Sequence, residues 1–363
     1  METIITIIFI LLAASSIYMV ACISRFKFMR TLAGKRKWVG WLASAGLILL
    51  CLLVLSVVFS TVNALVIFLH LVAFFLIVGG IMRLVRHFTK KEFNYNLQGL
   101  LAVAFAAIYL VIGWVSLHHV WQADYNLTTD KDVNLKVAMI ADSHLGTSFD
   151  GAGFAKHMET IQAQHPDLLV IAGDFVDDST KREDMIAACE ALGRMNLKYG
   201  VFYVYGNHDR GYFNGRDFTA EDMEAELAKN GVRVLKDDVI LVDGSFYLIG
   251  RKDRSMRERK EIAELLENTD TTKYIIVADH QPADYEKQAD STADLVLSGH
   301  THGGWMFPVN IISNLLNIDD KTYGHEQRKG TDFIVTSGIS DWELKFRTGT
   351  RSEYVIVNIK NQP

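Results

Sequence analysis

The chain has 363 residues, which is enough for two domains of ordinary size. Charge is divided unevenly along it, because residues 1–122 carry ten Lys and Arg residues against two acids, whereas residues 123–363 carry 27 against 40. The acidic C-terminal part argues against a nucleic-acid partner, since nonspecific nucleic-acid binding needs a basic surface.

Four apolar stretches in residues 1–122 have the length of about 20 residues that crosses the hydrocarbon core of a bilayer. They cover residues 3–23, 38–59, 62–82 and 97–119. No charged residue lies between Trp38 and Met82, so the middle two spans are expected to be joined by a tight turn near Ser60. The first stretch lacks the basic start and the cleavage site of a signal peptide and is predicted to be a retained span. Residues 1–122 are therefore predicted to form a transmembrane helical domain.

The basic residues of this domain lie in two loops. Residues 24–37 carry six Lys and Arg residues and residues 83–96 carry four, while the predicted turn at Ser60 carries none. Short loops rich in Lys and Arg stay on the cytoplasmic side of a membrane. Our hypothesis is a multi-pass protein of the cell membrane in which both loops are cytoplasmic. Four spans then place the C-terminal domain in the extracytoplasmic space.

Residues 123–134 are polar and aperiodic, and they are predicted to form a linker to a second domain over residues 135–363. That domain alternates short apolar runs with charged stretches, a pattern typical of an α/β layered fold. The runs predicted as strands are Leu135–Ala141, Leu168–Ala172, Gly200–Tyr205, Val239–Ile249, Tyr274–Ala278, Leu295–Leu297, Phe333–Val335 and Tyr354–Ile359. Capping-box spacing beginning at Thr180, Thr219 and Ser255 predicts helix starts between them.

Five of the predicted strands end in residues that bind metal ions in proteins. The segments at these ends are Ala141–His144, Gly173–Asp177, Tyr205–Asp209, Ala278–His280 and Ser298–Gly304. Side chains that follow the carboxyl ends of several strands can converge on one site. Asp142 and His144 are two residues apart, as are His300 and His302, so each pair points to one side of an extended segment. The sequence therefore predicts a shared metal site.

The predicted ligands are oxygen and nitrogen donors of mixed type. They are Asp142, His144, Asp174, Asn207, His280, His300 and His302. Imidazole combined with carboxylate favours Zn, Mn or Fe over an all-oxygen Ca site. Seven ligands exceed the needs of one tetrahedral ion and suit two divalent ions that share a carboxylate. Such a pair can activate water and neutralise charge at a phosphoryl group. No P-loop or Gly-x-Ser-x-Gly motif supports an NTPase or a serine hydrolase.

The order of five short motifs resembles that of the calcineurin-like metallophosphoesterases. The motifs are Asp-x-His at 142–144, Gly-Asp-x-x-Asp at 173–177, Gly-Asn-His-Asp at 206–209, His280, and Gly-His-Thr-His-Gly-Gly at 299–304. The resemblance covers residues 135–363, and the last motif together with the tail at 335–354 is similar to a bacterial membrane-associated branch. It implies a four-layer α/β/β/α sandwich after the transmembrane domain.

The resemblance also implies an activity, that of a metal-dependent phosphoric ester hydrolase acting on a phosphomonoester or a phosphodiester. The first ion would be held by Asp142, His144, Asp174 and His302, and the second by Asp174 as the bridging residue with Asn207, His280 and His300. A hydroxide bridging the two ions would attack phosphorus directly. His208 would act as the general acid, and Asp209 would orient it.

Members of this branch tend to act on lipid-linked or cell-envelope phosphoesters, so a phosphoester of this kind is the expected substrate. Trp305 departs from the family pattern, in which a polar residue, often Gln, stands at this place. The segment Trp305–Ile312 is hypothesised to form an apolar wall that admits a lipid phosphate, with ordinary loop packing as the alternative. Two other functions stay open: a phosphodiesterase or nucleotidase for soluble substrates whose helices only anchor it, and a catalytically silent envelope sensor or scaffold.

Three further positions have two interpretations each. Asp177 is a site residue or stabilises its loop. Asp279 is predicted to be solvated or structural. The charged segment Arg251–Arg254 is predicted to be a solvated turn, with contact to substrate phosphate as the alternative.

Overall fold

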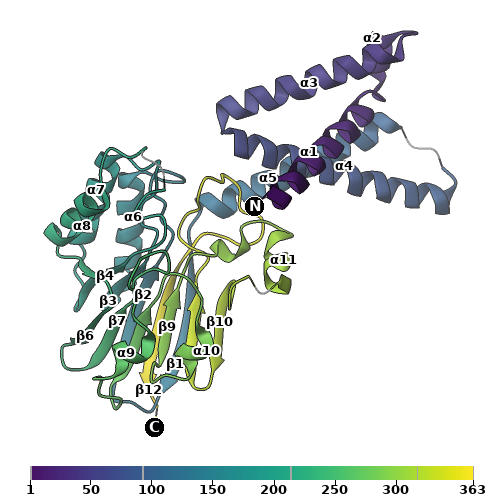
Figure 1. Ribbon diagram of the computed structural model, residues 1–363. Coiled ribbons are helices and arrows are strands. Elements are labelled where there is room, and N and C mark those ends of the chain that lie inside the picture. The colour runs from purple at the N-terminus through teal and green to yellow at the C-terminus, as the bar shows by residue number, and fades with distance from the viewer. Residues whose placement is uncertain (1, 92–93, 213–214, 317, 363) are drawn as a thin grey trace. The chain divides into compact units, whose positions relative to one another are not determined.

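The computed structural model of the protein describes residues 2–91, 94–212, 215–316 and 318–362. The chain divides into two compact units, Met1–Ile112 and Gly113–Pro363. The boundary falls within the helix Tyr95–His118, so the last turns of this helix belong to the second unit. Figure 1 shows the helices of the first unit and the strands and helices of the second.

The first unit consists of apolar helices. They are α1 (Glu2–Ile23), α2 (Lys27–Ala33), α3 (Lys37–Val58), α4 (Thr61–Thr89) and the larger part of α5 (Tyr95–His118). No proline occurs before residue 166, so nothing in these stretches breaks the backbone hydrogen bonding of a helix. The expected turn is present, since the Ser60 side chain caps α4 by accepting a hydrogen bond of 3.2 Å from the Asn63 amide.

Helices α3, α4 and α5 are each long and apolar enough to cross a membrane, and α1 with α2 adds a fourth span if that bent pair counts as one. The pair is bent by 83°. The predicted loop at residues 24–37 thus contains the short helix α2, and α4 continues beyond the predicted end at residue 82 to Thr89. Many apolar side chains of α3, α4 and α5 are exposed, as helix faces that contact lipid are.

Two six-stranded sheets form the centre of the second unit. One has the order β1 (Trp121–Thr129), β12 (Glu353–Asn361), β2 (Leu135–Ile140), β3 (Leu168–Ala172), β4 (Gly200–Val204) and β5 (Arg233–Leu235). The other has the order β10 (Gly324–Arg328), β11 (Thr331–Val335), β9 (Leu295–Ser298), β8 (Tyr274–Ala278), β7 (Phe246–Gly250) and β6 (Asp238–Val242). Strands β2 to β5 are parallel to one another, as are β7, β8, β9 and β11.

The sheets pack face to face, and helices cover their outer faces (Figure 1). Helices α6 (Gly151–Gln162), α7 (Arg182–Gly193) and α8 (Ala220–Lys229) cover the first sheet, and α9 (Ile262–Leu266) and α10 (Tyr285–Ala289) cover the second. Alternate residues such as Val137 and Leu248 fill the space between the sheets. The predicted α/β/β/α sandwich is confirmed.

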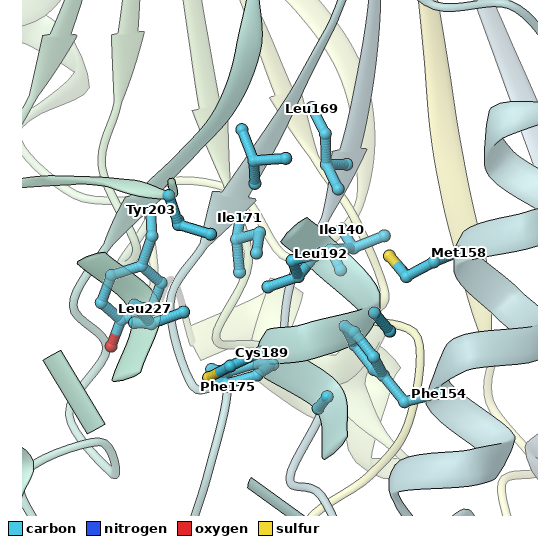
Figure 2. Packing of buried hydrophobic residues seen from close by; sticks show 14 of the residues in the cluster. Ile140, Phe154, Met158, Leu169, Ile171, Phe175, Cys189, Leu192, Tyr203 and Leu227 are labelled. Atoms are coloured by element: carbon cyan, nitrogen blue, oxygen red, sulfur yellow. The ribbon is translucent and has the colours of Figure 1, made fainter. Parts of the chain in front are cut away.

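The helix layer on the first sheet is held by large apolar side chains (Figure 2). Leu169 and Ile171 of β3 and Tyr203 of β4 lie in one buried cluster with Phe154 of α6 and Leu192 of α7. Each such side chain contributes about 1.5–3 kcal/mol when it leaves water. This packing fixes β3 and β4, and with them the loops that follow these strands.

The predicted linker at residues 123–134 is wrong. Residues Trp121–Thr129 form β1, which pairs in parallel with β12. Every second residue of β1, Ala123, Tyr125 and Leu127, packs on the core between the sheets, while the alternate residues face outward. The strand was missed because it is an edge strand whose polar residues outnumber its apolar ones.

Other element boundaries also differ from the sequence prediction. The run Val239–Ile249 is two antiparallel strands, β6 and β7, joined by a turn at residues 243–245. The short strands β5 and β10 were not predicted. The capping box at Thr219 is confirmed at the start of α8, whereas α7 begins at Arg182 and α9 at Ile262, beyond the expected starts.

Candidate metal centre

The predicted ligands follow the carboxyl ends of β2, β3, β4, β8 and β9. Five of them have a backbone in the left-handed region, with φ of 53° at Asp142, 35° at His144, 50° at Asp174, 72° at His300 and 50° at His302. This conformation costs on the order of 1–3 kcal/mol for a residue with a side chain and gathers at functional sites. The turns after the strands are thus held in strained shapes that aim these side chains inward.

Six of the seven predicted ligands form two groups. One consists of Asp142, His144 and His302, and the other of Asp174, His280 and His300. In each group the donor atoms all lie within 4.8 Å of one another. Asp174 Oδ2 lies 3.6 Å from Nε2 of His144 in the first group and 3.2 Å from Nε2 of His280 in its own. The Asp174 carboxylate therefore stands between the two groups.

The seventh predicted ligand, Asn207, lies beside the second group. Its Oδ1 is 3.0 Å from Nε2 of His280, and its amide nitrogen donates a hydrogen bond of 2.8 Å to the Tyr212 hydroxyl. The hydrogen bond fixes the amide so that its oxygen, the atom that can bind a metal, faces His280.

Backbone amides hold the two carboxylates in place. Asp174 Oδ1 accepts from the His208 amide at 2.8 Å, which leaves Oδ2 directed at the histidines. Asp142 accepts from the His300 amide at 3.0 Å. Gly206 is required by this arrangement, because a Cβ there would lie 2.1 Å from Asp174 Oδ1.

The electrostatics of the buried groups fit bound cations. Burial raises the pKa of Asp142 to about 7, although His280 opposes the shift. Burial also disfavours the charged form of Asp174, but the adjacent His280 lowers its pKa overall. Among the described residues, neither ring nitrogen of His144 has a hydrogen-bond partner. Buried polar and charged groups of this kind need compensation, and divalent ions would supply it.

An oxygen atom lies behind the rings of His280 and His144 and favours one ring orientation. Nδ1 of His280 lies 2.8 Å from the carbonyl oxygen of Ala172. Asp177 Oδ2 lies 3.5 Å from Nδ1 of His144. A ring whose Nδ1 faces an oxygen presents Nε2 to a metal, an arrangement found at most metal-bound histidines. Asp177 therefore lies in the site, behind a predicted ligand.

Two residues behind His302 were not predicted from the sequence. Asp341 Oδ1 lies 3.5 Å from Nδ1 of His302, and Asp341 Oδ2 accepts a hydrogen bond of 3.0 Å from Nε of Arg347. Both residues are fully buried, and Arg347 also donates to the carbonyl oxygens of Ser337 and Ser340. The pair fixes His302 and the chain after β11. Both residues lie in the tail at 335–354, whose resemblance to the bacterial branch did not indicate this role.

Asp209 does not orient His208, so the role predicted for it is wrong. Its carboxylate accepts hydrogen bonds of 2.6–3.1 Å from the amides of residues 174–176 and of Gly206. Burial raises the pKa of Asp209 to about 6, and the neighbouring Asp174 contributes. Asp209 therefore ties the turn after β3 to the turn after β4, which keeps Asp174 and Asn207 together.

His208 lies at the edge of the candidate centre. Its ring centroid is 4.9 Å from that of His144, 4.8 Å from that of Tyr212 and 5.2 Å from that of Trp342. Its Nδ1 has no hydrogen-bond partner in the part of the chain that the structure describes. Burial lowers the pKa of His208, while Asp174 and Asp177 oppose that shift. His208 is thus a ring in the pocket wall with a free nitrogen atom.

The charged segment after β7 is not a solvated turn at Arg251. The Arg251 guanidinium is buried and donates to Asp279 Oδ2 at 2.9 Å, and Arg259 donates to the same oxygen at 2.6 Å. Asp279 is fully buried, which confirms the structural interpretation of this residue. The two ion pairs fix the chain immediately before His280.

A cavity of about 300 Å³ opens over both groups. Its polar lining includes Asp174, His208, His300 and His302, and its apolar lining consists of Trp305, Val309, Ile312, Ile318 and Trp342. The Trp305 ring stacks on His302, with centroids 5.5 Å apart and an interplanar angle of 25°. Trp305 and the residues of α11 (Val309–Leu316) therefore form one wall of the pocket that contains the candidate ligands.

Comparison with known proteins agrees with this geometry. The sequence profile of the calcineurin-like phosphoesterases matches residues 135–304. An uncharacterized metallophosphoesterase of Aquifex aeolicus is 30% identical over 246 residues, which cover 66% of this chain and 91% of that protein. The chain belongs to the calcineurin-like metallophosphoesterase family. The resemblance predicted from the five motifs is confirmed.

Two further relatives extend the similarity. An uncharacterized metallophosphoesterase of Campylobacter jejuni is 27% identical over 282 residues, 75% of this chain and 73% of that protein. A Danio rerio protein named as a transmembrane protein with a metallophosphoesterase domain is 28% identical over 239 residues, 62% of this chain and 53% of that protein. The family uses a dinuclear metal centre, for which the two groups are the candidate residues. The apolar helices show that the protein is associated with a membrane.

Proposed function

We propose that this chain is a membrane-anchored phosphoesterase that uses two divalent metal ions, either Mn, Fe or Zn. The first ion would be held by Asp142, His144, Asp174 and His302, and the second by Asp174, Asn207, His280 and His300. The observation that carries the proposal is the position of Asp174 Oδ2, within 3.6 Å of a histidine Nε2 from each group. A single carboxylate placed in this way suits the bridging position of a two-metal site.

The ions, when bound, supply an activated water molecule and neutralise negative charge on the phosphoryl group. The proton for the leaving group would come from a side chain of the protein. His208 lies in the pocket wall, so its ring can donate a proton to the leaving oxygen. An anionic phosphate beside the ring would raise the pKa of His208 and oppose the lowering caused by burial. Binding of the substrate would thereby favour the protonated form of His208, which is the form that donates the proton.

The proposed substrate is a lipid-linked or cell-envelope phosphoester, either a monoester or a diester. Support comes from the pocket wall, where Trp305, Val309 and Ile312 stand beside the candidate ligands. The hydrocarbon part of a lipid phosphoester would be stabilised against such a wall. The helices then anchor the enzyme in the membrane that holds its substrate.

A substrate panel with the purified, metal-loaded chain tests this proposal. We expect hydrolysis of phosphoesters, and we expect Trp305→Ala to lower kcat/KM for a lipid phosphoester by roughly threefold to tenfold, the equivalent of an aromatic contact of about 0.5–1.5 kcal/mol. The same variant should hydrolyse a small aryl phosphate at nearly the wild-type rate. An equal loss on both substrates would contradict a lipid-binding wall.

The remaining outcomes of the panel separate the alternatives. Activity confined to soluble phosphodiesters or nucleotides would support an enzyme whose helices serve only as an anchor. No turnover on any ester by protein shown to contain metal would support a catalytically silent sensor or scaffold.

We also propose that the second unit is extracytoplasmic, because the basic loops at residues 24–37 and 83–96 favour the cytoplasmic side. A cysteine introduced at the exposed Glu183 should react with a membrane-impermeant maleimide in intact cells. A cysteine at Lys35 in the first basic loop should react only after the cells are permeabilised. The opposite pattern would show that the orientation is reversed.

A further inference from the structure

Helix α11 turns its apolar side outward. At 3.6 residues per turn, its apolar residues, which are Val309, Ile311, Ile312, Leu315 and Leu316, fall on one side of the helix, and its polar residues fall on the other. A surface helix of a globular domain ordinarily buries the apolar side. Here Leu315 is 75% exposed, Leu316 68%, Ile312 47% and Ile311 46%.

The polar side of α11 faces the domain. A Cβ at Gly304 would lie 2.5 Å from Asn310 Cα, and a Cβ at Gly349 would lie 3.4 Å from Asn310 Cγ, so Asn310 packs on backbone at both places. The exposed apolar side chains continue before and after the helix with Phe307 and Ile318. We refer to residues 307–316 together with Ile318 as the lip. The lip contains no Asp, Glu, Lys or Arg.

The lip is connected to the end of a candidate membrane span by one loop, residues 347–352. The amides of Thr348 and Gly349 donate hydrogen bonds of 3.2 Å and 3.1 Å to the carbonyl oxygen of Trp305, just before the lip. The same loop binds the last turns of α5. The Arg347 amide donates to the Gly113 carbonyl at 2.9 Å, and the Ser352 amide donates to the Ser116 carbonyl at 2.9 Å.

Chemistry on the polar side of the lip also suits a lipid surface. A cavity of about 750 Å³ lies there, lined by Asn310 of α11, Ser116 of α5, Lys321, Tyr323 and Arg351, among others. Lys321 is paired with Glu326 at 3.1 Å and the Tyr323 hydroxyl donates to Glu353 at 2.8 Å, which leaves Arg351 as the basic group of this lining. A basic side chain beside an exposed apolar helix is the combination with which interfacial helices bind phospholipids, the apolar side among acyl chains and the basic group at phosphates.

From these observations we propose that the lip inserts into the interfacial layer of the bilayer from which α5 emerges. The exposed apolar side lies among the acyl chains, while Arg351 lies at the level of the headgroups. Val309 and Ile312 of the lip also line the cavity over the candidate ligands. A lipid phosphoester then passes from the bilayer to the candidate metal centre along one continuous apolar surface.

The proposal depends on membrane association and not on catalysis, and it is tested with the full chain in lipid vesicles. Cys22, Cys51 and Cys189 are replaced by Ser, and a cysteine introduced by Leu315→Cys carries an environment-sensitive fluorophore. We expect blue-shifted emission, most of which is lost when the vesicles contain lipids spin-labelled near the headgroup. The matched control, Glu183→Cys on exposed α7, should show neither the shift nor the loss.

Two results would overturn the proposal. One is emission from the Leu315→Cys probe that is as insensitive to spin-labelled lipid as that of the Glu183→Cys control. The other is cross-linking between Leu315→Cys chains together with an unquenched probe, which would show that a second copy covers the lip. The Asp174→Asn substitution should leave the quenching unchanged, so failure of the lip and failure of the phosphoesterase proposal give different results.

Discussion

Asp174→Asn is expected to remove at least one of the two metal ions from the purified protein and to lower kcat/KM by at least about a hundredfold. The substitution keeps the size of the side chain and an oxygen that can accept from the His208 amide, as Asp174 Oδ1 does. It replaces Oδ2, the atom between His144 and His280, by an amide nitrogen that cannot ligate a cation. Elemental analysis of bound metal and hydrolysis of an aryl phosphate measure the two effects.

The matched control is Asp130→Asn, at an exposed position of the same domain. It should retain the metal content and the turnover of the wild type. Wild-type metal content and turnover in Asp174→Asn would contradict the bridging position of this carboxylate. A melting curve of the metal-free variant, compared with that of the metal-free wild type, distinguishes loss of ligation from loss of folding.

His208→Ala is expected to have the opposite combination of effects, full metal content with turnover reduced by about 10²–10⁴-fold. The reason is that His208 lines the pocket but belongs to neither group of candidate ligands. The loss should be large for esters with poor leaving groups, which need a proton, and small for a nitrophenyl ester, whose leaving group departs as an anion. Rates on a series of leaving groups measure the dependence.

His165→Asn is the control for this change, at an exposed histidine whose left-handed backbone Asn tolerates. It should leave the leaving-group series unaltered. If His208→Ala hydrolyses esters of poor leaving groups at nearly the wild-type rate, the role of general acid belongs to another group. If instead the variant loses metal, His208 acts on the candidate centre rather than on the substrate.

Much of the candidate site could be predicted because its ligands come directly after strands. A ligand that follows an apolar run, such as Asp142 or Asp174, is placed by the sheet, and the sheet is visible in the sequence. Asp341 and Arg347 could not be found in this way. They follow no strand directly, and their role depends on a loop that returns from β11 to His302.

The incorrect role of Asp209 has a local cause. The resemblance placed it beside His208 in the sequence, but residues 207–210 form a bend followed by a turn, in which neighbouring side chains need not point the same way. His208 turns toward the pocket, and Asp209 turns toward the amides of the loop after β3.

The predicted membrane helices depended on length and hydropathy alone, and these properties are sufficient where no charge interrupts an apolar run. Length and hydropathy say little about where a helix begins and ends. Helix α4 continues through Arg83 and Arg86, and the basic stretch after α1 forms α2, because Lys and Arg are good helix formers. Strand β1 was missed for a related reason: an edge strand can consist largely of polar residues, so its sequence lacks the apolar run by which the other strands were predicted.

The pairing of β1 with β12 determines where a soluble catalytic fragment can begin. A cut at residue 134, where the sequence predicts the domain to start, would remove β1 and leave one edge of β12, which pairs with β1 over nine residues, without its partner strand. Such an open edge invites aggregation between molecules. The same cut would also remove the carbonyl groups of Gly113 and Ser116, which accept hydrogen bonds from the loop at residues 347–352. A fragment that begins upstream of Gly113 keeps both, together with a short apolar stub that a detergent can cover.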